Sequence, residues 1–392
     1  MTAPRADHTA TLLPDGKVLL TGGDQGSVLL KTAELYDPST GVYTATSKNM
    51  RIARNKHTAT LLPNGQVLIE GGKSADLYDP ATQKFPAAIG TPLARTSHTA
   101  TLLNDGTVLV AGGYIGGIAT NLAEIYNPAS QSFTALSQTM KVPRANPTAT
   151  LMLDGTVFIT GGFSGTSPHD ETEFYNSSSQ TFTAGTSMLY HRSNHDAIRL
   201  PDGRLLVIGG VTLESGFLAQ NEIYNPTSQT WSLHDTMSEN RGNPTSTLLL
   251  NGTILVAGGA TGNATLMTAA ILDPVTHAFT SLGNMQSGRN QHSATLLPDG
   301  TVLLAAGSTD TAPMKSAEVF NPASNSFTSV GFLTTARKSH TATLLANNMV
   351  LISGGKTATG YLRSSELSNP APSPFQVAGN RKALRALWTV WT

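Results

Sequence analysis

The sequence predicts an all-β protein that is built from eight copies of one four-stranded unit. An arginine stands three residues before a His or Pro in eight places, at successive steps of 49, 41, 49, 48, 49, 48 and 48 residues. Seven of the eight copies carry Asp-Gly or Asn-Gly at the same point, and seven carry a Gly-Gly pair a few residues later. A period of this length indicates a repeat fold, in which each unit buries its apolar surface against its neighbours.

The repeats divide the chain into units of nearly equal length. We expect one domain over residues 1–379, with a non-repeat C-terminal tail over 380–392. The eight units cover about 1–50, 51–91, 92–140, 141–188, 189–237, 238–285, 286–333 and 334–379.

The first copy shows the elements of one unit. His8–Leu13 alternates in the manner of a strand and leads to Asp15-Gly16, a pair that favours a two-residue type I′ hairpin turn. Lys17–Thr21 is nearly all apolar, so both faces of this second strand should be covered. A third strand over Ala33–Pro38 and a fourth that carries the aromatic Tyr43 complete the unit.

Four short antiparallel strands in a unit of about 48 residues favour blades arranged around a central axis. We expect eight blades in one ring, with seven as the alternative. The fourth-strand aromatic should fill the wider outer rim; it recurs at Tyr43, Phe85, Phe133, Phe182, Trp231, Phe279, Phe327 and Phe375.

The motifs of the unit resemble the kelch repeat. The Gly-Gly pair, the third-strand tyrosine in A-E-L-Y-D-P and the fourth-strand aromatic match that motif at its usual period. The amino-acid sequence of the units is similar to that of bacterial kelch proteins and of the propeller of galactose oxidase-like proteins. The resemblance implies a kelch-type β-propeller. That family's copper chemistry needs a cysteine cross-linked to a tyrosine, and this chain has no cysteine. We therefore expect no cofactor and no metal site.

The repeated arginine has a repeated acidic counterpart in the third strand. The simplest interpretation is a structural Arg–carboxylate pair in each blade, and the alternative is a ring of positive charge at the channel mouth. The residues assigned structural roles are Arg5, Arg54, Arg95, Arg144, Arg192, Arg289, Arg337, Glu34, Glu124, Glu173, Glu222, Glu318, Glu366, Gly22, Gly23, Gly112 and Gly113. In the sixth unit Ala270 replaces the acid, so we expect Arg241 to be freer and available to a ligand.

Six of the ten histidines occupy one motif position, three residues after the arginine. Ligands of one metal cluster on a few elements, whereas these positions recur once per unit. We expect them to form hydrogen bonds between blades.

Binding residues should collect in the variable loops after the glycine pairs, because loops on a rigid scaffold carry function. All eight of these loops should emerge on one face. The candidate ligand-binding residues are Arg241, Tyr114, Phe163, His169, Asp170, Glu171, Glu214 and Phe217. No catalytic residue is assigned.

Composition excludes several functions. The chain has 25 Lys and Arg against 25 Asp and Glu, which leaves no electrostatic footprint for nucleic acid or an anionic membrane. We expect a non-catalytic monomer that binds a protein, peptide or glycan through the loops after the Gly-Gly pairs. The alternative is a carbohydrate-active enzyme, or the propeller of a larger secreted enzyme. The resemblance implies a bacterial protein, and the composition favours an extracellular or periplasmic setting; we expect no signal peptide in this chain.

Overall fold

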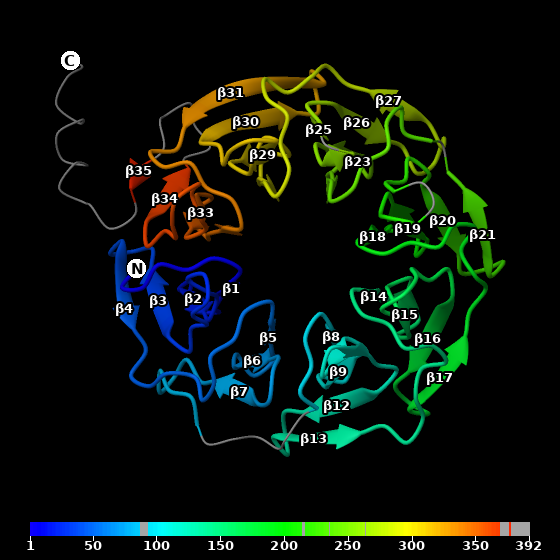
Figure 1. Cartoon of the computed structure of the whole chain (residues 1–392), viewed down its shortest axis with the longest axis horizontal. Coiled ribbons are helices and arrows are strands. Elements are labelled where there is room, and N and C mark those ends of the chain that lie inside the picture. The colour runs from blue at the N-terminus through cyan, green and yellow to red at the C-terminus, as the bar shows by residue number, and fades with distance from the viewer. Residues whose placement is uncertain (87–92, 214–215, 235, 263, 369–375, 378–392) are drawn as a thin grey trace.

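The computed structural model describes residues 1–86, 93–213, 216–234, 236–262, 264–368 and 376–377. The described residues form strands and turns, with no helix that could cross a membrane. Figure 1 shows eight small sheets arranged as blades around a central axis, with the first and last blades side by side. The predicted eight-bladed, all-β propeller is thus confirmed, and the seven-bladed alternative is wrong.

The first four blades follow one another along the chain. Their strands are β1 (Thr9–Leu12), β2 (Val18–Thr21), β3 (Ala33–Asp37) and β4 (Val42–Ala45); β5 (Thr58–Leu61), β6 (Val67–Glu70) and β7 (Ala75–Tyr78); β8 (Thr99–Leu102), β9 (Val108–Ala111), β12 (Ala123–Asn127) and β13 (Ser132–Ala135); and β14 (Thr148–Leu151), β15 (Val157–Thr160), β16 (Thr172–Asn176) and β17 (Thr181–Ala184).

The last four blades repeat the pattern. Their strands are β18 (Asp196–Arg199), β19 (Leu205–Ile208), β20 (Glu222–Asn225) and β21 (Thr230–Leu233); β22 (Thr245–Leu248), β23 (Ile254–Ala257), β26 (Ala269–Leu272) and β27 (Phe279–Ser281); β28 (Ser293–Leu296), β29 (Val302–Ala305), β30 (Ser316–Asn321) and β31 (Ser326–Phe332); and β32 (Thr341–Leu344), β33 (Val350–Ser353), β34 (Ser365–Ser368) and β35 (Gln376–Val377). Two short hairpins, β10–β11 (Tyr114–Ile115, Ile118–Ala119) and β24–β25 (Ala260–Thr261, Ala264–Thr265), decorate loops of blades 3 and 6.

The hydrophobic core lies between the blades. One cluster joins Leu109 and Ile125 of blade 3 to Val157, Ile159 and Tyr175 of blade 4. Every residue of the second strand is buried in each blade, because neighbouring blades cover both faces of the sheet. The apolar character of this strand in the sequence has the same cause.

The turn after the first strand differs from the predicted type I′. Gly16 has a φ of 80°, whereas Asp15 is not among the residues with positive φ. The Gly16 N–H donates to the Leu13 carbonyl at 2.9 Å, and the Leu13 N–H donates to the Lys17 carbonyl at 2.8 Å. This is the pattern of a type I turn followed by a glycine bulge, which needs only one residue in the left-handed region. The Asp15 carboxylate instead accepts the Lys17 N–H at 3.0 Å.

Blade 2 departs from the predicted four strands. Within its described residues it has three strands, and only an isolated bridge between Asp79 and Lys84 continues the sheet outwards. Phe85 still occupies the aromatic position, 5.3 Å from the Tyr78 ring. Phe375 and the tail 380–392, which the sequence also singled out, lie outside the described residues.

The ring closes without exchanging a strand between the two chain ends. Blades 1 and 8 each use four consecutive strands of their own. The Gly355 N–H of blade 8 donates to the Arg5 carbonyl at 2.8 Å, and the Arg5 N–H donates to the Leu362 carbonyl at 3.0 Å. The Tyr43 hydroxyl of blade 1 donates to the Ser365 Oγ at 2.6 Å. The seam therefore relies on the same type of contact that joins the other blades.

Candidate functional site

The repeated arginines are buried and form the framework of the ring. In blade 4, Arg144 Nη1 donates to the Gly161 carbonyl at 2.7 Å, and Nη2 donates to Glu173 at 2.8 Å. The Arg144 carbonyl also accepts the Gly113 N–H of blade 3 at 2.8 Å. The side chain thus holds its own blade while the backbone holds the preceding one. Equivalent Arg–acid pairs are Arg5–Glu34, Arg54–Asp76, Arg95–Glu124, Arg192–Glu222, Arg289–Glu318 and Arg337–Glu366.

The prediction that Arg241 is free for a ligand is wrong. Its side chain is 1% exposed and donates to the Gly258 carbonyl at 3.0 Å. Arg241 Nη2 lies 3.7 Å from a carboxylate oxygen of Glu239, which also accepts a hydrogen bond from Thr268 Oγ1. Glu239 comes from the linker before Arg241 and takes the place of the missing third-strand acid.

The repeated histidines connect neighbouring blades. His195 Nε2 lies 3.0 Å from Thr148 Oγ1 and 3.1 Å from Thr160 Oγ1 of the preceding blade. Burial and nearby arginines lower the pKa of His195 to about 3, so the ring is neutral at pH 7. The same bond type recurs at His8, His57, His98, His292 and His340. These side chains are committed to the scaffold.

The loop aromatics do not converge on one pocket. Tyr114 pairs with Thr96 in its own blade, Phe163 bridges Ala145, and Phe217 packs over Gly242 of the next blade. Among the residues that the structure describes, no ring–ring contact joins Tyr114, Phe163 and Phe217. Glu214, the remaining loop candidate of blade 5, lies outside the described residues.

The loop of blade 4 does bring three titratable side chains together. His169 Nδ1 lies 3.0 Å from Glu171 Oε2, and His169 Nε2 lies 3.1 Å from the Pro143 carbonyl. Burial and the adjacent Glu171 carboxylate raise the pKa of Asp170. Against the effect of burial, hydrogen bonds from its own backbone and from His169 lower the pKa of Glu171. The two carboxyl groups are therefore separated in acidity, as in sites where one acts as an acid and the other as a base.

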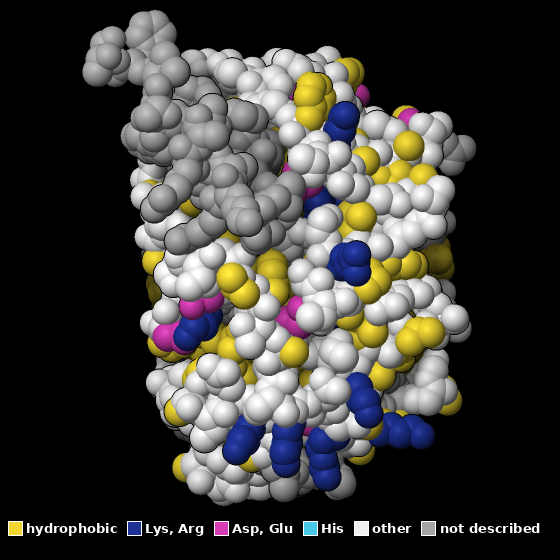
Figure 2. Space-filling model, turned by 90° about the vertical axis from the view of Figure 1, so that its left-hand side faces the viewer, with side chains coloured by type: hydrophobic (Ala, Val, Ile, Leu, Met, Phe, Trp, Pro, Cys, Tyr) yellow, Lys and Arg dark blue, Asp and Glu magenta, His cyan; other side chains and the backbone are white. Residues whose placement is uncertain are grey.

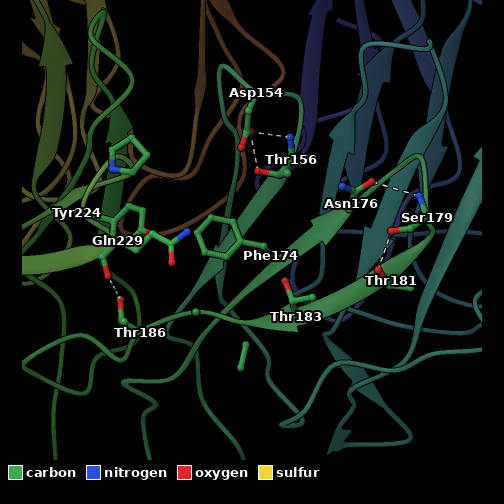
Figure 3. Close-up of a pocket in the computed structure, with 13 residues that line it drawn as sticks. Asp154, Thr156, Phe174, Asn176, Ser179, Thr181, Thr183, Thr186, Tyr224 and Gln229 are labelled. Atoms are coloured by element: carbon green, nitrogen blue, oxygen red, sulfur yellow. Dashed lines mark hydrogen bonds between the residues drawn. The ribbon is translucent and has the colours of Figure 1, made fainter.

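A pocket lies at the outer rim, between blades 4 and 5 (Figure 3), and we call it the 4/5 groove. Its volume is about 570 Å³. Its apolar floor is formed by Phe174 and Tyr224, and polar side chains stand around them: Asp154, Thr156, Asn176, Ser179, Thr181, Thr183, Thr186 and Gln229. In Figure 3 the Phe174 ring and the Gln229 amide point toward one another.

Two departures from the repeat pattern open this groove. Position 174 holds Phe where the third strands of blades 3 and 5 have Ile125 and Ile223. Gly185 stands where blade 3 has Leu136, a buried core residue. A Cβ on Gly185 would overlap Thr172 Oγ1 and lie 3.1 Å from the Phe174 ring, so the glycine makes room for both side chains. Phe174 in turn stacks on Phe158 with a centroid distance of 4.1 Å.

The polar side chains around the groove are exposed or half-buried, and several of them form hydrogen bonds within the protein. Asp154 Oδ1 accepts the Thr156 N–H at 2.9 Å and the Thr156 hydroxyl at 2.7 Å. Thr186 Oγ1 donates to the Gln229 carbonyl at 2.9 Å and ties the two blades together. These hydrogen bonds restrict the side chains of Asp154, Thr156 and Thr186, which lowers the side-chain entropy that a ligand would have to overcome there.

The outer rim near blade 1 has a different character. Figure 2 shows scattered Lys and Arg side chains on a mostly uncharged surface there. The Lys17 Nζ–Asp15 pair, at 3.0 Å, belongs to this part of the chain. Among the described residues that line the 4/5 groove, in contrast, there is no lysine or arginine.

Comparisons with known proteins identify the fold class. No family model matches the sequence, and no curated protein matches it. Among solved structures, the chain resembles a fungal alcohol oxidase described as showing catalytic diversity among the AA5 family, in complex with copper. The TM-score is 0.60 with 19% sequence identity, over 91% of this chain and 73% of that chain. At this identity the comparison shows the fold alone, which is an eight-bladed β-propeller.

This comparison contradicts the expected non-catalytic binding module, because the structure that shares the fold is an oxidase. The copper site of such an enzyme does not fit the residues present here. The chain has no cysteine, and the described residues contain no group of three or more His, Asp or Glu side chains that could hold a metal ion.

Sequence reasoning placed the site in the loops after the glycine pairs and missed the 4/5 groove. A signal was nevertheless present. Phe158, Phe174 and Gly185 all break the repeat consensus within one unit. Departures that occur together in one unit of a repeat protein indicate a local function or a local repacking.

Proposed function

We propose that this chain is a carbohydrate-active enzyme, or the propeller of one, and that the 4/5 groove binds the sugar. The observation that carries the proposal is the half-buried Phe174 ring in the groove floor, surrounded by hydroxyl, amide and carboxylate side chains. The C–H face of a sugar packs on an aromatic ring, while its hydroxyl groups need ordered donors and acceptors. Similarity to an alcohol oxidase supports an enzyme that acts on a hydroxyl-rich compound.

The candidate acid–base groups, Asp170 and Glu171, are not among the residues that line the groove, but hydrogen bonds connect their segment to its edge. Thr186, at its edge, accepts a hydrogen bond from Thr172 Oγ1 at 2.8 Å through its carbonyl. Two residues further, the Met188 N–H donates to the Asp170 carbonyl at 2.9 Å. Asp170 and Glu171 thus belong to the same junction of blades 4 and 5. Asp170 is the candidate proton donor and Glu171 the candidate acceptor.

The binding step is tested with a substitution to a residue that other blades already carry. Phe174→Ile introduces the residue that blades 3 and 5 have at this position. We expect it to weaken binding of a neutral oligosaccharide by about tenfold or more in isothermal titration calorimetry, because it removes the stacking surface. Gln131→Ala, in the equivalent turn of blade 3 where φ is 50°, is the matched control and should leave binding unchanged.

The chemical step is tested on oligosaccharides that bind. Asp170→Asn and Glu171→Gln should abolish turnover, measured by product analysis, while the dissociation constant stays within about twofold of the wild type. Full activity in both variants would show that the carboxylates have no catalytic role. Wild-type protein that binds no oligosaccharide at all would refute the proposed function.

A further inference from the structure

A second groove lies beside the first and is built from equivalent residues. The 3/4 groove, between blades 3 and 4, has a volume of about 250 Å³. Its lining includes Asp105, Thr107, Asn127, Thr134 and Gln180. Each of these recurs 49 residues later, with the same residue type, in the lining of the 4/5 groove as Asp154, Thr156, Asn176, Thr183 and Gln229.

The two grooves share a wall. The turn between β16 and β17 contributes Ser177 and Gln180 to the 3/4 groove. The same turn contributes Asn176, Ser179 and Thr181 to the 4/5 groove. Ser179 Oγ and Thr181 Oγ1 lie 2.7 Å apart on this exposed turn. One turn therefore separates the grooves, and a ligand can pass from one to the other over hydroxyl groups.

The grooves differ in volume, about 250 Å³ for the 3/4 groove and about 570 Å³ for the 4/5 groove. Leu136 and Ile125 line the 3/4 groove where the 4/5 groove has Gly185 and Phe174. The 3/4 groove thus keeps the polar side chains and Tyr175, the counterpart of Tyr224, but lacks the Phe174 ring. It is suited to an additional sugar unit, whereas the 4/5 groove should have the higher affinity for a sugar.

The charge of the grooves restricts the ligand further. Each lining contains one carboxylate, Asp105 or Asp154, and the described residues of neither lining include Lys, Arg or His. A uronic acid unit would place its own carboxylate next to Asp154 with no compensating cation, which is unfavourable. An uncharged sugar can use the same carboxylate as a hydrogen-bond acceptor.

We propose that the two grooves are adjacent subsites for one neutral oligosaccharide chain, which lies across the 176–181 turn. This inference rests on the proposed function and adds that the ligand is a neutral polymer. A chain that occupies both subsites gains affinity, because its second contact is intramolecular.

The test is a titration series with neutral oligosaccharides of two to eight units, for example cello-, manno- and xylo-oligosaccharides, and with oligogalacturonates of the same lengths. We expect affinity for the recognised neutral series to rise roughly tenfold or more between the short and the long members. Gln180→Ala should remove this gain and leave the affinity for the short members unchanged. Gln229→Ala should weaken binding of both, and Gln131→Ala is the control for the shared backbone geometry, since φ is 50–56° at all three positions.

The outcomes separate the two proposals. If short and long members bind equally and Gln180→Ala has no effect, the 4/5 groove is a single site and the two-subsite inference is refuted, while the proposed function stands. If oligogalacturonates bind more tightly than neutral chains, the assignment to a neutral polymer is refuted. If no oligosaccharide binds, both proposals fail together. Thermal unfolding of each variant, expected within about 2 °C of the wild type because the glutamine side chains are exposed, shows that the fold is retained.

Discussion

At the scale of single residues, the buried Arg–carboxylate pairs matter most for the free energy of unfolding. A buried pair gains little over an apolar replacement, but removing one partner leaves an uncompensated buried charge. Glu173 is 2% exposed and accepts both the Arg144 guanidinium and the Lys141 N–H, the latter at 2.6 Å. Loss of Arg144 would leave the buried Glu173 carboxylate with a single backbone donor, the Lys141 N–H.

We therefore predict that Arg144→Met lowers the free energy of unfolding by about 3–5 kcal/mol. Arg241→Met should cost less, because its partner Glu239 has a side chain that is 38% exposed and can be solvated. Urea denaturation followed by circular dichroism measures both variants side by side. An equal loss would show that solvation of the partner carboxylate does not decide the cost.

At the scale of one element, the end of the second strand is where blades approach most closely. Gly161 follows β15 with a φ of 57°, and a Cβ there would lie 2.5 Å from the Arg192 carbonyl and 2.7 Å from His195. The Arg192 carbonyl accepts the Gly162 N–H at 3.0 Å. A side chain at Gly161 would push the next blade away.

Gly161→Val should accordingly lower the melting temperature strongly, through backbone strain and the clash with Arg192. Gly283→Val is the matched control: its φ is not positive, and no described atom lies within 4 Å of the position that a Cβ would occupy. We expect the control to shift the melting temperature by no more than about 2 °C in differential scanning calorimetry. A stable Gly161→Val protein would contradict the assigned close approach.

The repeated histidines also depend on the residue that ends the second strand of the preceding blade. His57, His98 and His195 face a second strand that ends on Thr21, Glu70 and Thr160, all of which offer a polar atom.

Where the second strand ends on an apolar residue, the histidine is no longer required. Pro147 and Pro244 follow blades whose second strands end on Ala111 and Ile208. His292 follows a strand that ends on Ala257, and its ring bonds to the first-strand Thr245 hydroxyl at 2.9 Å. The exchange of His for Pro thus occurs only where the second strand offers no polar side chain.

At the scale of the whole molecule, the histidines that connect neighbouring blades make the free energy of unfolding depend on pH. Burial and adjacent arginines lower the pKa values of His57, His195, His292 and His340 to about 3. In the unfolded chain a histidine has a pKa near 6.5. Between these values the unfolded state binds more protons, so stability is complete above about pH 6.5 and is lost as the pH falls toward 3.

Each such histidine should lower the free energy of unfolding by about 1.4 kcal/mol for every pH unit below its pKa in the unfolded chain. We predict a marked fall in the urea midpoint between pH 7 and pH 5. His195→Gln removes one of these groups and should show a smaller fall over the same interval. Equal urea midpoints at pH 7 and pH 5 for the wild type would refute the neutral, buried state of these histidines.

Much of the architecture could be predicted because its contacts repeat along the chain. The Arg-to-Gly bond within a blade joins residues 17 apart, as in Arg144 and Gly161, and the same spacing recurs in other units. The fully buried second strand is visible as an apolar run. The turn type was predicted wrongly, because a Gly after an Asp fits both a type I′ turn and a type I turn with a glycine bulge.

The sequence by itself thus determined the repeat number, the class of fold and the Arg–acid pairs of seven blades. Tertiary structure decided the surroundings of Arg241 and the shape of the 4/5 groove. Glu239 neutralises Arg241 from a neighbouring linker, and Phe174 meets Gln229 only because blades 4 and 5 lie side by side. The physical reason is that a blade's own contacts follow the repeat period, whereas a groove is the space that remains between two blades. That space depends on the volumes of side chains from both, here opened by Gly185.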